Sequence, residues 1–64
     1  MRQGTKAEFE KALATPHADV RRIIDRRVTE TDVTKGGKIL AMGTVVYLSA
    51  RSRKVVGQTY LVAD

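Results

Sequence analysis

Few side chains in this chain could perform acid–base chemistry. His17 is the only histidine, and the sequence contains no cysteine. Thr15 and Pro16 place His17 in the first turn of an expected helix, where an imidazole could serve as a general base. No serine nucleophile motif accompanies it, and an isolated surface histidine explains the residue more simply. We therefore predict no catalytic residue and regard an enzymatic activity as the less favoured function.

Glu30 and Asp32 are the second candidate for chemistry, because residues two apart on a strand lie on the same face. Paired carboxylates can hold a metal ion or act as an acid and a base. Lysines and arginines lie close by in the sequence, and cross-strand pairing with them is the simpler role. One histidine and no cysteine also make a structural zinc site unfavourable. The sequence therefore predicts neither a metal nor a cofactor.

Two short basic segments could bind an anion. The first is the turn "KGGK", in which two glycines would let backbone N–H groups approach a phosphate, although a hairpin turn alone explains them. The second is "RSRK", the densest basic cluster, and arginine and lysine provide the sequence-independent part of nucleic-acid binding. The two turns should lie at opposite ends of the strand between them. The predicted anion-binding residues are Lys35, Gly36, Gly37, Lys38, Arg51, Arg53 and Lys54.

The charge is concentrated in the second half of the chain. Residues 1–32 carry seven basic and six acidic side chains, and residues 33–64 carry five basic and one acidic, within a formal net charge of +5. This asymmetry favours a polyanionic partner such as nucleic acid, or an acidic protein surface. A solubilising charge of this size is also ordinary for a small domain. No apolar stretch is long enough to span a membrane, and no signal peptide is recognisable, so we expect a soluble, cytoplasmic protein.

The first half of the chain has the pattern of helices. Thr5-Lys6-Ala7-Glu8 has the form of a capping box, so a helix should begin there and end near Ala14, before Pro16. Thr15 would cap a second helix, whose apolar stripe would be Val20, Ile23 and Ile24. We therefore predict helical structure over residues 5–26.

From residue 27 the pattern changes to the two-residue period of strands. The segment "RRVTETDVT" is β-branched and polar on both faces, as in an edge strand. Gly36-Gly37 marks a hairpin turn, after which strands are expected over about 38–49 and 54–63. The predicted fold is a single α+β domain over residues 1–64: one or two N-terminal helices (helical 5–26) packed on a three-stranded antiparallel meander (sheet 27–63).

The central strand is apolar on both faces, and the predicted helices can cover only one of them. A chain of 64 residues without cysteine also needs additional buried area, which self-association would supply. We therefore expect a homodimer formed through the sheet, either face to face or by edge extension. In the alternative, the helices wrap around both faces. The predicted dimer interface is Leu40, Met42, Val46 and Leu48.

Two family resemblances occur in the sheet half. Residues 28–62, "VTETDVTKGGKILAMGTVVYLSARSRKVVGQTYLV", resemble the last three strands of hot-dog-fold acyl-CoA thioesterases. That resemblance implies dimerisation through the sheets. The family's long central helix lies between earlier and later strands, whereas the helices expected here come first, and the chain lacks a His-Gly-Gly turn and a matching catalytic acid or Asn, which implies a reduced, inactive relative. The segment "VTKGGKILAMGTVVYLSARSRKVVG" is more weakly similar to the double-stranded-RNA-binding-like domain of ribosomal protein S5.

Three functions follow, in order of preference. The first is a small basic, non-enzymatic binding module that contacts nucleic acid or another acidic partner as a homodimer. The second is a reduced hot-dog-fold acyl-CoA thioesterase relative. The third is a small inhibitor or scaffold that docks on another protein by a strand edge.

Overall fold

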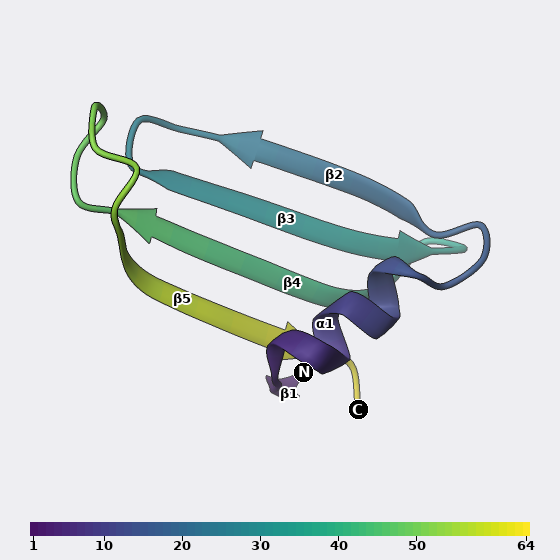
Figure 1. Ribbon diagram of the computed structural model, residues 1–64. Helices are drawn as coiled ribbons and strands as arrows, with labels where there is room; N and C mark the ends of the chain where they lie inside the picture. The colour runs from purple at the N-terminus through teal and green to yellow at the C-terminus, as the bar shows by residue number, and fades with distance from the viewer.

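The computed structural model describes all 64 residues and consists of one antiparallel sheet with one helix on it (Figure 1). The five strands lie in the order β1-β5-β4-β3-β2, so that β1 and β2 form the two edges. The molecule is elongated, with extents of 35 × 19 × 17 Å. The elements are β1 (Arg2–Gln3), α1 (Lys6–Leu13), β2 (Asp19–Ile24), β3 (Val28–Lys35), β4 (Lys38–Tyr47) and β5 (Val55–Val62).

The start of α1 confirms the capping box expected from the sequence. The Thr5 hydroxyl accepts a hydrogen bond from the backbone N–H of Glu8 at 3.2 Å, and the Glu8 carboxylate accepts one from the backbone N–H of Thr5 at 3.1 Å. These reciprocal bonds satisfy two N–H groups that have no partner within the helix. The helix ends at the C-cap residue Ala14, as the following proline indicated.

The second predicted helix is wrong, because residues 19–24 form strand β2. His17 has a φ of 62°, in the left-handed region, so the chain turns at this point instead of beginning a helix. Val20, Ile23 and Ile24 fit a helical stripe by spacing, but they are β-branched and favour a strand. Pairing with β3 along all six residues decides the outcome, with Val20 opposite Val33 and Ile24 opposite Thr29.

The predicted fold class is also wrong, because the sheet has five strands and the helical part is a single helix of eight residues. β3 is not an edge strand, since β2 covers its outer side. The short strand β1 pairs with β5 and extends the sheet at its other edge. The protein is therefore a mostly antiparallel sheet with one short helix, and not two helices on a three-stranded meander.

The core lies between α1 and one end of the sheet. It consists of Phe9 from the helix and Val33, Ala41 and Val62 from three strands. A Cβ atom at Gly43 would lie 3.1 Å from the Phe9 ring, so the missing side chain makes room for that ring. The helix covers one end of the sheet face, as Figure 1 shows, and the opposite face carries no element at all.

The turn between β3 and β4 confirms the predicted hairpin. Gly36 and Gly37 both have positive φ angles, 59° and 80°, which suit the primed turns that match the twist of paired strands. A β-bulge follows directly, because Thr34 pairs with Ile39 and Val33 with Ala41, which leaves Leu40 without a partner. Leu40 consequently packs against the core on the helix side of the sheet.

Candidate anion-binding site

The β2–β3 turn and the β4–β5 loop meet at the end of the sheet farthest from α1 (Figure 1). Tyr47 donates its backbone N–H to the carbonyl oxygen of Arg27 at 2.7 Å, which ties the end of β4 to the turn. Leu48 donates to the carbonyl oxygen of Lys54 at 2.9 Å, which closes the base of the longer loop. Two segments that are more than twenty residues apart in the sequence therefore form one end of the molecule.

Five basic residues come together on these two segments, and we refer to them as the basic end. All five side chains are exposed. The molecule has three ion pairs, Met1 with Asp64, Arg2 with Glu8 and Arg21 with Asp32, and none involves the basic end. Its positive charges are therefore available to an external anion. The basic end consists of Arg26, Arg27, Arg51, Arg53 and Lys54.

Backbone hydrogen bonds to side chains give the basic end its shape. The Ser49 hydroxyl accepts from the backbone N–H of Ser52 at 3.0 Å, and the Ser52 hydroxyl accepts from that of Lys54 at 3.2 Å. The Asp25 carboxylate accepts from the backbone N–H of Arg26 at 2.7 Å, which holds the β2–β3 turn. Such local bonds are typical of turns that replace regular strand pairing.

A small hollow of about 130 Å³ opens between the two segments. Its charged members are Asp25, Arg26 and Arg53, and Ser49 and Thr29 add hydroxyl groups. Guanidinium and hydroxyl donors are the groups that hold phosphate oxygens in proteins. The Asp25 carboxylate is engaged with the backbone of its own turn. With two guanidinium groups against one carboxylate, the hollow keeps a net positive charge that suits an oxyanion.

The structure divides the predicted anion-binding residues into two groups. Arg51, Arg53 and Lys54 belong to the basic end, while the turn from Lys35 to Lys38 lies at the opposite end of β4. This separation confirms the expectation that the two basic turns do not form one patch. Arg26 and Arg27 were not among the predicted anion-binding residues, because Arg26 was assigned to a helix. The β-branched character of residues 20–24 was the signal that could have placed these arginines in a turn between strands.

The acid–base candidates do not form a site. His17 lies exposed in the turn before β2, and Glu30 and Asp32 lie on the opposite side of the sheet from α1. Asp32 accepts a hydrogen bond at 3.1 Å from Arg21 of the neighbouring strand, a residue that the sequence had placed on a helix. Its other oxygen, Oδ1, is buried without a hydrogen-bond partner. No group of three or more histidine, aspartate or glutamate side chains is placed to hold a metal ion.

The predicted interface residues are also separated. Met42 and Val46 lie half-buried on the sheet face that no helix covers, which we call the open face. The β-bulge places Leu40 on the helix side instead, and Leu48 lies exposed in the loop after β4.

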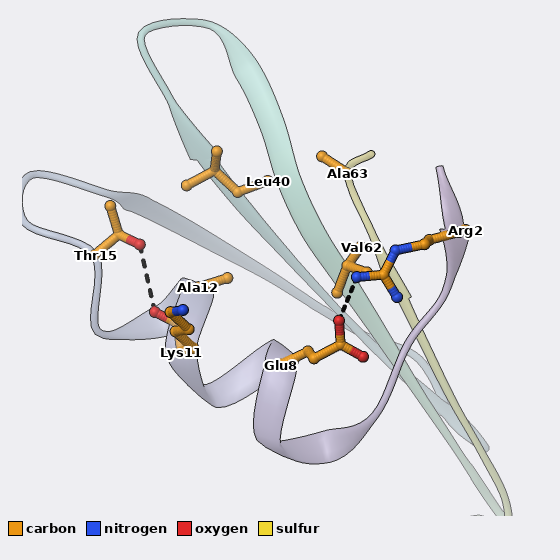
Figure 2. A pocket seen from close by; sticks show the side chains of 8 residues that line it. All are labelled: Arg2, Glu8, Lys11, Ala12, Thr15, Leu40, Val62 and Ala63. Carbon is orange, nitrogen blue, oxygen red and sulfur yellow. Dashed lines mark hydrogen bonds and ion pairs between the residues drawn. The ribbon is translucent and has the colours of Figure 1, made fainter.

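The largest cavity, about 340 Å³, lies beside α1 and is shown in Figure 2. Leu40, Val62 and Ala63 form its apolar wall, and Arg2 and Lys11 are its cations. Arg2 is already paired with Glu8, and the hydrogen bond between them raises the pKa of the Arg2 guanidinium. This cavity therefore offers one free cation, Lys11, and is a poorer anion site than the basic end.

No family model, curated protein or solved structure matches this chain. The eight-residue helix is too short to cross a membrane.

Proposed function

We propose that this protein is a non-enzymatic binding module that contacts the phosphates of nucleic acid through the basic end. The observation that supports this function is the meeting of five exposed cations, none with a carboxylate partner, on two adjoining loops. Each lysine or arginine that neutralises a phosphate releases condensed counterions, which drives binding without reading the base sequence.

A double-stranded nucleic acid is the ligand that the shape favours. The long axis of the molecule is 35 Å, close to the roughly 34–36 Å of one turn of duplex DNA. Lys35 and Lys38 at the opposite end could then contact phosphates one turn away from those at the basic end. The chain has only three aromatic residues, and Phe9 is buried in the core, so platforms for stacking single-stranded bases are few.

A matched pair of charge reversals tests this proposal. Arg51→Glu with Arg53→Glu alters the basic end, while Lys6→Glu with Lys11→Glu alters exposed lysines of α1. Each pair removes four units of positive charge from the net +5, so total charge is held equal. Binding to a fluorescent 20-base-pair duplex is followed by anisotropy, with circular dichroism as the check on folding.

We expect the variant at the basic end to lose at least tenfold in affinity and the helix variant to lose less than threefold. Equal losses in the two variants would show that net charge alone causes binding, and no binding by the unaltered protein at low salt would exclude the function.

One structural observation favours the acyl-CoA alternative as the second candidate. α1 follows the short strand β1 and precedes the other four strands, so a helix lies between earlier and later strands, as in the hot-dog-fold thioesterases that the sheet half resembles. In this case the basic end would hold the phosphates of coenzyme A. A thermal shift with an acyl-CoA that inorganic phosphate does not reproduce would favour this candidate, and no shift would exclude it.

A further inference from the structure

The protein exposes more surface than a folded monomer of its mass should. Its accessible surface is 4866 Å², whereas a monomer of 7.1 kDa is expected to expose roughly 4,100 Å². The excess, about 800 Å², equals the share that one partner contributes to a protein–protein interface of standard size. Only five residues are buried, so the isolated chain has a small core.

The uncovered apolar surface lies on the helix side of the sheet, beyond the end of α1. Gly43 faces the Phe9 ring, so Val45 and Tyr47, two and four residues further along β4, face the same side. Register places Ile24 and Thr29 in the row of Val45 on one side, the polar Gln58 on the other side of Val45, and Val55 opposite Tyr47. Ile24 is 74% exposed and Val55 48%. We call these five residues, Ile24, Thr29, Val45, Tyr47 and Val55, the bare strand surface.

The open face is a weaker candidate for an interface. Its middle row holds the polar residues Glu30, Thr44 and Thr59 beside one apolar residue, Ile23, which pairs with Glu30. The next row contains the ion pair of Arg21 with Asp32. Such a face suits contact with water, as one side of an antiparallel sheet commonly does.

A groove lies where α1 borders the bare strand surface. α1 packs on one end of the sheet (Figure 1). Beside it lies this groove, of about 160 Å³, lined by Glu10 and Leu13 of the helix and by Val45 and Tyr60 of the sheet. Small residues, Ala7 in the helix and Ala14 at its C-cap, are exposed beside the charged Lys6, Glu10 and Lys11. When a second copy is turned end to end, its helix meets the bare strand surface of the first.

We propose that two copies of this chain pack helix side to helix side and head to tail, so that α1 of each covers the bare strand surface of the other. This isologous arrangement buries the same surface on both copies. It goes beyond the proposed function and does not depend on it. The five cations of the basic end belong to turns beyond the strand ends, so they lie at the two outer ends of the dimer. Ile24, Thr29 and Tyr47 also line the hollow, so α1 of the second copy would lie against one side of it.

The solution mass of two matched variants tests this arrangement. Ile24→Glu places a charge on the bare strand surface, and Ile39→Glu places the same charge on an isoleucine that is 47% exposed at the other end of the sheet. We expect the unaltered chain and Ile39→Glu to have twice the 7.1 kDa monomer mass by light scattering, and Ile24→Glu to be a monomer. A monomer at all concentrations up to about 100 μM would overturn the proposal, since a specific dimer of this size should bind more tightly than that.

Cross-linking tests the head-to-tail geometry independently, and the absence of native cysteines makes introduced ones unique. A Leu13→Cys chain is mixed with an Ile24→Cys chain and oxidised. We expect the mixture to form a disulfide-linked dimer in higher yield than a mixture of Leu13→Cys with Ile39→Cys. Equal yields in the two mixtures would overturn the arrangement. It would also be overturned if Ile24→Glu leaves the dimer intact while Met42→Glu, on the open face, dissociates it.

Discussion

Gly43 is the residue where the packing of α1 on the sheet is most sensitive to a single added atom. A methyl group there would lie 3.1 Å from two carbons of the Phe9 ring, which is itself in the core. We expect Gly43→Ala to lower the free energy of unfolding by about 1–3 kcal/mol, because the ring must shift within a packed site. Urea denaturation measures the change.

Gly57→Ala is the matched control for that substitution. Its Cβ would meet only Val46, at the ordinary contact distance of 3.6 Å. The control should therefore change stability by less than about 0.5 kcal/mol. If the two alanine variants unfold at the same urea concentration, then Phe9 does not pack against β4 as described.

Glu8 gives the fold a dependence on acid pH. The hydrogen bond from Arg2, and then that from the backbone of Thr5, lower the pKa of the Glu8 carboxyl below its ordinary value of 4.5. A carboxyl with a lowered pKa stabilises the folded state above its unfolded pKa, and this contribution is lost as the pH falls through the folded value. We expect Glu8→Gln to reduce the loss of thermal stability below pH 4.5, measured as Tm against pH. An unchanged pH profile would show that the pair contributes nothing in solution.

At the scale of elements, local sequence signals predicted the structure where a few neighbouring residues decide it. Two such signals were predicted correctly: the capping box at Thr5 and Glu8, and the two glycines of the β3–β4 turn. Each depends on contacts within three or four residues. Residues 19–24 were predicted incorrectly, because the spacing of Val20, Ile23 and Ile24 fits a helix and a strand equally well. Only pairing with β3, the other strand of the same hairpin, resolves that ambiguity.

The same limit explains how much of the candidate site could be predicted. Arg51, Arg53 and Lys54 are adjacent in the sequence and were recognised as a basic cluster. Arg26 and Arg27 join them only because β2 and β3 form a hairpin whose turn reaches the same end of the sheet. The bulge that moves Leu40 to the helix side also depends on register between two strands, which alternation along one strand does not show.

Replacing His17 by glycine changes the stability in opposite directions in the observed turn and in the predicted helix. With φ at 62°, a non-glycine residue is strained in the left-handed region, so His17→Gly should stabilise the fold by about 1 kcal/mol. In the first turn of the predicted helix the same change would instead destabilise, by at most about 1 kcal/mol. Thermal unfolding gives the sign, and a lower Tm for the glycine variant would contradict the turn.

At the scale of the whole molecule, the distribution of charge makes binding dependent on salt. If the basic end neutralises several phosphates, the logarithm of the binding constant falls linearly with the logarithm of salt concentration, with a slope of about −0.9 for each phosphate. Arg51→Glu with Arg53→Glu should reduce the magnitude of the slope by about 2. A slope near zero for the unaltered protein would contradict phosphate contact.

NMR mapping of the contact surface shows whether the basic end is where DNA binds. A short DNA duplex is titrated into ¹⁵N-labelled protein, and the shifts of the backbone amide signals are followed residue by residue. We expect the largest shifts in residues 24–29 and 47–54, which include the basic end and the lining of its hollow. Shifts concentrated in α1 or in the middle of the strands, with the β2–β3 turn and the β4–β5 loop unaffected, would contradict binding at the basic end.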